Sequence, residues 1–204
     1  QGRPFYGKIA IAGGKSTRGL STHLKSMGLE PSRPDDVRVP TQYPDIPQVR
    51  EHIATHYNTI LMTDHALGKV MAQLKEDGLW GNTIIFLYSD HGSDLPRSKE
   101  FVYHEGLQVP FIVAAPGLTT EIRHGSRRDD IVNLMDITAT SLALAGLDVP
   151  DYMDSRNVFD PEYHREYVFS SADRMSNVID RVRSVMGTEF HYIRNFLTDR
   201  PLMK

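Results

Sequence analysis

Two residues that could bind a metal ion, Asp90 and His91, directly follow an apolar run at Thr83–Tyr88 (TIIFLY) that predicts a strand. In open α/β sheets, ligands sit at the carboxyl ends of strands, so these side chains would face the expected crevice. An ionised Asp90 offers a hard oxygen ligand and a neutral His91 a nitrogen, while Gly92 permits the tight turn that brings both to one ion. The alternative is that Asp90 caps the next segment and His91 makes an ordinary hydrogen bond.

A lysine and a histidine follow in the next segment, which reads LPRSKEFVYHEG. Lys99, close to a metal, could bind an anionic group as a compact point charge and stabilise negative charge that grows on a leaving oxygen. His104 and Glu105 are candidates for a ligand contact or for a general acid. The alternatives are a solvated Lys99 and a loop that His104 and Glu105 only hold in place.

The composition excludes several classes of protein. The 204 residues, 40% hydrophobic and 24% charged, predict a globular chain with a sizeable core. The net charge is −3 and the basic residues are spread out, so nucleic acid is not an expected partner. The chain has no apolar run of about eighteen residues and no signal-peptide pattern, so no membrane span is expected. It has no cysteine, which excludes a thiol nucleophile or a thiolate metal site in this segment.

The first part of the chain predicts one strand, a long irregular stretch and one long helix. The strand is expected at Phe5–Ala12, and residues 15–47 hold too many prolines for more than a short helix. Apolar side chains then recur every three or four positions over residues 53–74, which predicts a helix ending near Asp77–Gly78. Asp64 lies among these apolar positions, so we expect it to be buried and paired.

The later part predicts an α/β layered domain with a small β appendage. Thr83–Tyr88 and Val109–Ala114 are continuous apolar runs, typical of strands covered on both faces in a parallel sheet. A third strand is expected at Ile131–Leu134 and a helix from Ile137 to Gly146. Three short strands suited to an antiparallel sheet are expected at Tyr167–Ser171, Val182–Val185 and Phe190–Ile193.

Charges of alternating sign accompany these last strands. They predict local ion pairs or, alternatively, an arginine that faces a substrate. The residues concerned are Asp173, Arg174, Asp180, Arg181 and Arg183.

The stretch from Tyr57 to Gly117, with its segments LPRSK and YHEGLQVP, resembles the sulfatase family of the alkaline phosphatase superfamily, in particular its sulfamidase-like and bacterial members. The resemblance continues to DRVRSVMGTEFHYIRNF near the end of the chain. It implies an alkaline-phosphatase-like α/β/α sandwich with a mixed, mainly parallel sheet. Residues 1–165 would be the second part of that α/β domain, and residues 166–204 the beginning of a small antiparallel C-terminal β subdomain.

The resemblance also implies roles for the candidate residues. Family members hold one divalent cation, usually Ca²⁺, between two early aspartates and a later pair that Asp90 and His91 match. An imidazole also suits softer ions such as Mn²⁺, which is one alternative, and Mg²⁺ is another. Lys99 matches the sulfate-binding lysine, and His104 is expected to contact the substrate. The implied reaction begins with attack of a formylglycine hydrate on sulfur.

This sequence departs from the family pattern in two places. The formylglycine precursor lies in a C/S-x-P-x-R motif, whereas Ser32–Asp36 reads SRPDD and ends in Asp. We therefore expect the nucleophile and two metal-binding aspartates outside this chain, which would be a middle and late portion completed by the rest of a sulfatase. The family's His-x-Pro-His pattern is replaced by AGGK at residues 12–15, so Lys15 or His23 is expected to contact the anion, unless the substrate differs.

The sequence thus predicts a sulfuric ester or sulfamate hydrolase acting on a sulfated carbohydrate or small molecule. One alternative is a phosphodiesterase or phosphonate monoester hydrolase of the same superfamily, for which an Asp-His pair is equally suitable. The other is a non-catalytic binding module that keeps the fold without the nucleophile. The resemblance implies a periplasmic, secreted or lysosomal location.

Overall fold

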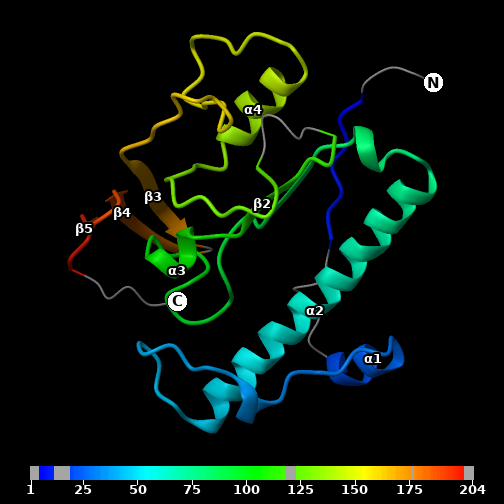
Figure 1. Ribbon diagram of the computed structural model, residues 1–204. Coiled ribbons are helices and arrows are strands. Elements are labelled where there is room, and N and C mark those ends of the chain that lie inside the picture. Colours follow the sequence, from blue (N-terminus) through cyan, green and yellow to red (C-terminus); the bar gives the residue numbers. More distant parts are fainter. Residues whose placement is uncertain (1–4, 12–18, 118–122, 176, 200–204) are drawn as a thin grey trace. The chain divides into compact units, whose positions relative to one another are not determined.

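The computed structural model describes residues 5–11, 19–117, 123–175 and 177–199. The chain forms two compact units, Gln1–Trp80 and Gly81–Lys204 (Figure 1). Asp90, His91, Lys99 and His104 all belong to the second unit, whereas His23 belongs to the first. The predicted boundary between residues 165 and 166 stays a prediction.

The first unit is built on helix α2, Pro47–Glu76, which confirms the predicted long helix. Proline at its first position suits the helix, because its fixed φ matches and its missing N–H would have no partner there. Its end is also as predicted, with Gly78 at a φ of 70°. The prediction for Asp64 was wrong, because its side chain is exposed. Periodic spacing of apolar residues predicts that a helix forms, but it does not show which neighbouring positions are buried.

Two short elements pack on α2: helix α1, Leu20–Ser26, and the 3₁₀ turn η1, Pro34–Asp36. The side-chain amide of buried Asn58 accepts from the backbone N–H of Ser32 at 2.7 Å and donates to its carbonyl at 3.3 Å. These bonds tie the irregular stretch to the helix, and only a short α-helix forms there, as predicted. The strand predicted at Phe5–Ala12 is wrong for residues 5–11, which pair with no strand in the described part of the chain. An apolar run forms a strand only where a neighbouring strand supplies backbone hydrogen-bond partners.

The second unit begins with strands β1, Ile85–Tyr88, and β2, Phe111–Ala114, which confirm two predicted strands. They pair with each other in antiparallel register, Ile85 opposite Ala114, whereas the apolar runs had indicated parallel neighbours. A continuous apolar run indicates that both faces of a strand are covered, but it does not indicate whether the neighbouring strand is parallel or antiparallel. The strand predicted at Ile131–Leu134 is wrong, because this segment leads into the N-terminus of helix α4, Asp136–Leu144. That helix itself was predicted.

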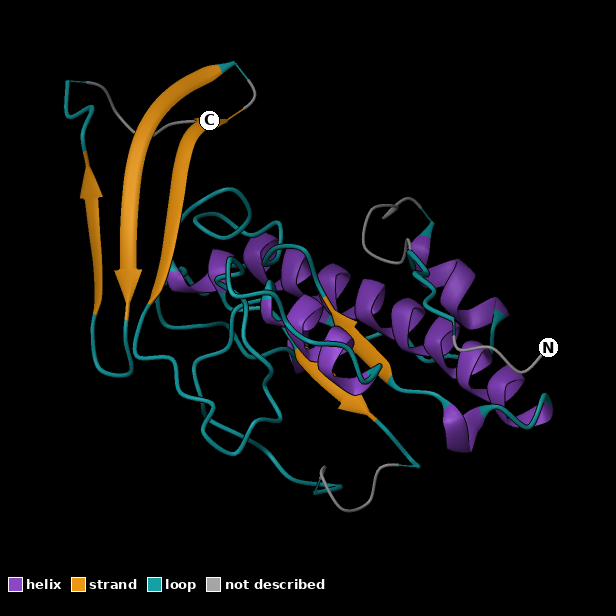
Figure 2. Ribbon diagram, turned by 90° about the horizontal axis from the view of Figure 1, so that it is seen from above, coloured by secondary structure: helices purple, strands orange, loops and turns teal. Residues whose placement is uncertain are grey.

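The predicted antiparallel sheet is present in the order β3–β4–β5, with strands Val168–Met175, Val178–Met186 and His191–Asn195. The ladder between β3 and β4 is interrupted by an irregularity between Ala172 and Arg174. Figure 2 shows the strands of this hairpin as long and curved. Such irregularities bend a strand and increase its twist.

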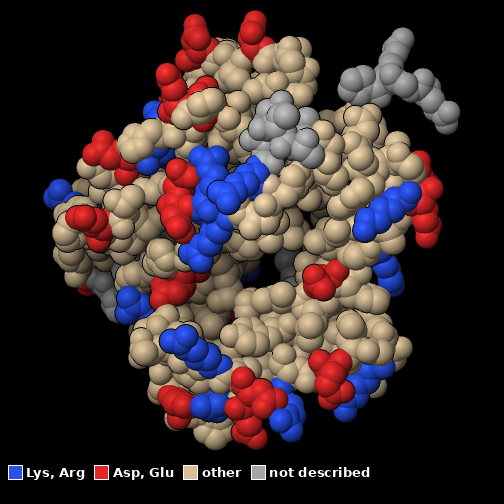
Figure 3. All heavy atoms as spheres, viewed as in Figure 1, with Lys and Arg blue, Asp and Glu red and all other residues tan. Residues whose placement is uncertain are grey.

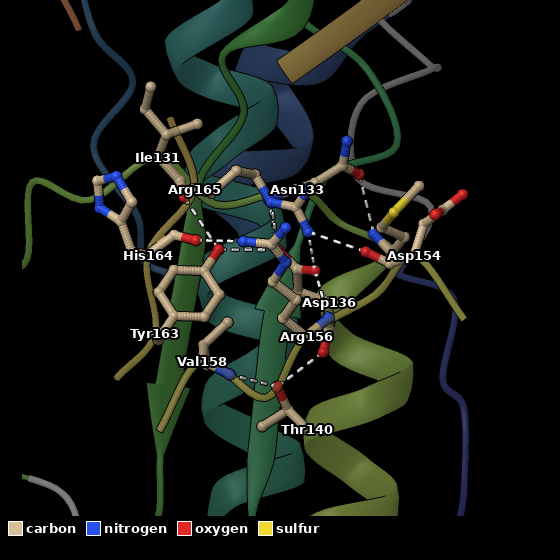
Figure 4. A network of polar contacts seen from close by, with 11 residues as sticks. Ile131, Asn133, Asp136, Thr140, Asp154, Arg156, Val158, Tyr163, His164 and Arg165 are labelled. Atoms are coloured by element: carbon tan, nitrogen blue, oxygen red, sulfur yellow. Dashed lines mark hydrogen bonds and ion pairs between the residues drawn. The ribbon is translucent and has the colours of Figure 1, made fainter. Parts of the chain in front are cut away.

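Residues before β3 are fixed by the buried carboxylate of Asp136 at the N-terminus of α4 (Figure 4). It accepts hydrogen bonds from the backbone N–H groups of Asn133 at 3.0 Å and Arg156 at 2.8 Å, from the Tyr163 hydroxyl at 2.9 Å and from Arg165 Nη2 at 2.6 Å. Burial and the neighbouring Asp136 raise the pKa of Tyr163 to about 12, so its hydroxyl remains a donor.

On the face shown in Figure 3, Lys and Arg are interspersed with Asp and Glu. Within the described residues, no helix is both long and apolar enough to cross a membrane.

We expect Asp136→Ala to lower the free energy of unfolding by about 3–5 kcal/mol, because the Arg165 side chain, only 12% exposed, would lose its counter-charge. Tyr163→Phe should cost about 1 kcal/mol, the net value of one hydrogen bond. Chemical denaturation measures both. Asp129→Ala, which removes an exposed ion-pair partner of Arg127, is the control and should stay within about 0.5 kcal/mol of the unmodified protein. Equal losses at positions 129 and 136 would contradict the interpretation.

Candidate functional site

The predicted metal-ligand pair lies at the end of β1, where the chain leaves the strand. The carboxylate oxygen Oδ1 of Asp90 is 3.7 Å from Nε2 of His91. The Asp90 side chain is 83% exposed and the His91 ring 38% exposed. Ser89 Oγ donates to the His91 carbonyl at 2.8 Å and so helps to set this turn.

The hydrogen bond of His91 decides which ring nitrogen can bind a metal. Nδ1 lies 2.7 Å from the carbonyl oxygen of Gly92, and a carbonyl can only accept, so Nδ1 carries the proton. In the neutral ring, Nε2 then carries the lone pair, beside the Asp90 carboxylate. Metal–ligand distances of about 2.0–2.6 Å place two neighbouring ligands roughly 3–4 Å apart, so the pair suits one cation.

Two side chains alone do not complete the ligand set of a divalent ion. Across the residues with a described placement, no group of three or more His, Cys, Asp and Glu side chains could hold a metal ion. Asp90 and His91 therefore fit a divalent ion that needs further ligands from elsewhere.

The segment after this turn folds back on it through two glycines. The N–H of Gly92 donates to the carbonyl of Gly106 at 3.1 Å. A Cβ at Gly92 would lie 1.9 Å from the carbonyl oxygen of Glu105, and one at Gly106 would lie 2.3 Å from the carbonyl oxygens of Ser98 and Phe101. No side chain fits at either position, so this backbone approach requires glycine. Glycine at position 92 thus serves this close approach, whereas the tight turn expected there is not formed, since the chain bends at Asp90 and His91.

Ser98 occupies the centre of this loop, which we define as residues 93–106. Its side chain is fully buried. The Ser98 hydroxyl donates to the carbonyl of Glu105 at 2.9 Å and accepts from Ser93 Oγ at 3.1 Å. Ser98 therefore joins both ends of the loop, and no feature of the sequence pattern had singled it out.

Lys99 sits next to Ser98, between two residues with unusual backbone conformations. Arg97 has a φ of 67° and Glu100 a φ of 78°, in the region that side chains other than glycine rarely adopt. The N–H of Lys99 donates to the carbonyl of Ser93 at 2.8 Å, and the guanidinium of Arg97 lies 4.1 Å from the Tyr103 ring centre. Strained backbone persists only where surrounding contacts hold it, and such strain clusters at functional sites.

His104 begins the short helix α3, His104–Leu107, and its side chain is exposed. It acts electrostatically on His191, the first residue of β5. Burial, and then the charge of His104, lower the pKa of His191. Nε2 of His191 is buried and has no hydrogen-bond partner among the described residues. Sequence reasoning missed His191, since neither strand spacing nor composition places it near His104.

Two further residues were predicted to contact the anion. Lys15 lies outside the described residues. His23 is exposed on α1, in the first unit. Their contact with an anion stays a prediction, as do the catalytic roles of Lys99 and His104.

Removing the buried hydroxyl tests the loop. Ser98→Ala should lower the free energy of unfolding by about 1–3 kcal/mol, because the carbonyl of Glu105 loses its donor in a buried place. Denaturant titration measures the loss. Ser126→Ala removes an exposed serine hydroxyl that donates to the Arg123 carbonyl, and should change stability by less than about 0.5 kcal/mol. If the two variants were equally stable, the loop would not depend on Ser98.

Two curated relatives are similar in sequence. An ulvan-active sulfatase from Formosa agariphila is 33% identical over 168 residues, which cover 81% of this chain and 28% of the relative. The human N-sulphoglucosamine sulphohydrolase is 27% identical over 150 residues, 74% of this chain and 29% of the relative. The chain thus spans less than a third of the length of either relative.

Two solved structures share the fold. One, determined in complex with its substrate D-glucosamine-2-N,6-O-disulfate, matches with a TM-score of 0.65 and 19% identity, over 89% of this chain and 37% of that chain. A phosphonate monoester hydrolase from Silicibacter pomeroyi matches with a TM-score of 0.57 and 20% identity, over 88% of this chain and 40% of that chain. These matches confirm the predicted alkaline-phosphatase-like α/β fold class.

The family model that matches this sequence is described as Sulfatase, and it covers residues 21–147. That range holds Asp90, His91 and the whole of the 93–106 loop. The resemblance seen in the sequence is confirmed: this chain belongs to the sulfatase family.

Proposed function

We propose that the protein of which this chain is part hydrolyses a sulfate ester or a sulfamate on a carbohydrate. One observation carries the proposal: the loop that holds Lys99 is anchored to the turn that presents Asp90 and His91. The Gly92–Gly106 hydrogen bond and the bond from Lys99 N–H to Ser93 close this loop. Membership of the sulfatase family supports the reaction class.

Lys99 is proposed to bind the sulfate group. An ammonium group next to a bound sulfate offsets the charge on its oxygens, and it acts most strongly where that charge grows in the transition state. The loop fixes the backbone on both sides of Lys99, so the side chain starts from a defined position. His104, exposed at the end of the same loop, is proposed as a substrate contact.

Asp90 and His91 are proposed to hold a divalent cation, Ca²⁺ in the first place, together with ligands from outside this chain. When bound, such an ion polarises the sulfate oxygens as a Lewis acid. This chain would supply two ligands, a carboxylate oxygen of Asp90 and Nε2 of His91, whose tautomer the Gly92 carbonyl fixes. The nucleophile is proposed to be a formylglycine that also lies outside this chain.

Sulfated sugars are the proposed substrate class. An ulvan-active sulfatase and an N-sulphoglucosamine sulphohydrolase are among the relatives. A structure with the same fold was solved with a disulfated glucosamine as its substrate. All three names concern a sulfated carbohydrate, which favours this class over other sulfate esters.

Phosphonate monoester hydrolysis is the second candidate function. His91 favours it, because an Asp-His pair suits a metal ion in a phosphoryl-type site equally well, and a phosphonate monoester hydrolase shares the fold. Turnover of an aryl sulfate and an aryl phosphonate monoester by the full-length protein separates the two. Turnover of neither, together with an upstream sequence that lacks C/S-x-P-x-R, would indicate a binding module.

Lys99→Ala should reduce turnover by the full-length protein about 10²-fold to 10³-fold, because the charge that stabilises the transition state is lost. Lys99→Arg, which keeps a positive charge, should recover part of it. Lys69→Ala, on the exposed side of α2, is the matched control and should retain full activity. Wild-type turnover by Lys99→Ala would show that this lysine is merely solvated.

Asp90→Ala should lower the divalent metal content of the purified full-length protein, as measured by elemental analysis after dialysis. The reason is the loss of one charged oxygen ligand. Asp148→Ala removes a carboxylate from an exposed position and should leave the metal content as it is. An Asp90→Ala protein with unchanged metal content would refute the assignment.

A further inference from the structure

Arg97 occupies a position where the backbone favours glycine. The N–H of Ser98 donates to the carbonyl of Leu95 at 3.1 Å, which closes a four-residue turn over Pro96 and Arg97. Proline fixes its own φ at about −65°, and Arg97 follows with a φ of 67°. This combination is a type II turn, whose third position usually holds glycine or asparagine. An arginine therefore stands there at a cost in conformational energy.

The contacts of the Arg97 side chain do not account for this cost. The side chain is exposed. Its guanidinium lies over the Tyr103 ring, 4.1 Å from the ring centre, and forms no hydrogen bond or ion pair with any residue that the structure describes. An exposed cation–π contact is of the same order as the cost of a left-handed backbone, so the two nearly cancel. The forked N–H donors of Arg97 thus remain available to a ligand.

The Tyr103 ring gives the guanidinium a defined place. Tyr103 itself stacks on Phe101, with the ring centres 5.9 Å apart. A planar guanidinium packs well on an aromatic face and keeps its N–H groups at its edges. The stack therefore orders a long side chain before any ligand binds, which reduces the entropy that binding would cost.

Lys99 lies in the turn that follows. The N–H of Phe101 donates to the carbonyl of Ser98 at 3.1 Å, so Lys99 and Glu100 form the centre of a second four-residue turn. Buried Ser98 belongs to both turns. The Cα atoms of Arg97 and Lys99 are two residues apart, which is no more than about 7 Å. One small ligand can therefore meet both cations.

Net charge does not draw an anion to this loop. Residues 93–106 hold Asp94, Glu100 and Glu105 as well as Arg97 and Lys99. Recognition of an anion here must come from directed hydrogen bonds. A guanidinium suits this task, because its planar fork matches two oxygens of a carboxylate or a sulfate, whereas a lysine acts as a point charge.

We propose that Arg97 binds a second anionic group, a sulfate or a carboxylate, on the same sugar unit whose sulfate Lys99 binds. This inference rests on the proposed function, which assigns the first sulfate to Lys99. Arg97 thereby selects doubly charged sugars over singly charged ones. It contacts no reacting atom, so its loss acts on KM more than on kcat.

The test compares, for the full-length protein, turnover of glucosamine-2-N,6-O-disulfate with turnover of the glucosamine monosulfate that it hydrolyses. In Arg97→Gly the preference for the disulfate, taken as the ratio of the two kcat/KM values, should fall about tenfold, because a charge-assisted hydrogen bond is lost. Arg97→Lys should recover part of it. Arg127→Gly replaces an 89% exposed arginine elsewhere in the second unit and should retain the full preference.

Stability separates substrate binding from a structural role. Glycine adopts a φ of 67° without strain, so Arg97→Gly should unfold at the same denaturant concentration as the unmodified protein or at a higher one. A lower midpoint, with equal losses of turnover for both sugars, would show that Arg97 only holds Tyr103. Equal losses in a stable variant would show that Arg97 shares the first sulfate with Lys99. Either result would overturn the proposal.

A sulfated uronic acid distinguishes the two anions. If Arg97→Gly loses the preference for this sugar and keeps that for the disulfate, the second group is a carboxylate. The opposite result assigns a second sulfate. Unchanged preference for both sugars would refute the role of Arg97.

Binding separates this inference from the proposed function. Calorimetry measures the affinity of the full-length protein for the disulfate and for the monosulfate, whether or not they are hydrolysed. If no sulfate were hydrolysed but Arg97→Gly weakened binding of the disulfate alone, the proposed function would fail and the site for two anions would stand. If sulfate were hydrolysed but Arg97→Gly kept the full preference for every doubly charged sugar, only the role of Arg97 would fail.

Discussion

A buried carboxylate must be paired, and in the second unit the pairing of Asp136 determines where the rest of the chain can go. Its donors come from the turn before α4 and from the segment that leads to β3. Arg165, the last of these donors, lies three residues before Val168, where β3 begins. The register of β3, β4 and β5 then brings His191 to the end of the sheet that is close enough to His104 for their charges to interact. One buried charge thus ties the turn before α4 to the segment that leads into the sheet.

The candidate site depends on a second constraint, which is steric. The backbone approaches at Gly92 and Gly106 leave no room for a Cβ, and the buried Ser98 hydroxyl bonds the Glu105 carbonyl beside Gly92. The positive φ values of Arg97 and Glu100 are unfavourable by themselves and persist because these contacts leave the chain no alternative. A loop built in this way gives Lys99 a fixed backbone at a cost in local conformational energy. This conformational cost would be offset if the fixed backbone positions the Lys99 ammonium group against a small, rigid anion, as we propose.

The elements that sequence patterns predicted well are those whose causes are local. Periodicity and a terminal Gly78 predicted α2, and three short strand-forming runs close together in the sequence predicted the three-stranded sheet. Strand direction, by contrast, was misjudged for Thr83–Tyr88, because an apolar run carries no information on its partner. Asp90, His91 and Lys99 could be found because their residue types are informative beside a strand end. Ser98 and His191 could not, since their surroundings come from residues distant in sequence or from a tertiary contact.

The two parts of the candidate site differ in how far they are already formed. Lys99 is held by hydrogen bonds that this chain makes with itself, so its backbone needs no partner to be fixed. Asp90 and His91 would form one side of the proposed cation site, with an exposed carboxylate that water solvates at little cost. Metal affinity rises steeply with the number of ligands that meet at one point, so two ligands bind weakly alone. The proposed anion contact therefore depends on this loop alone, whereas the proposed metal site depends on ligands that this chain does not supply among its described residues.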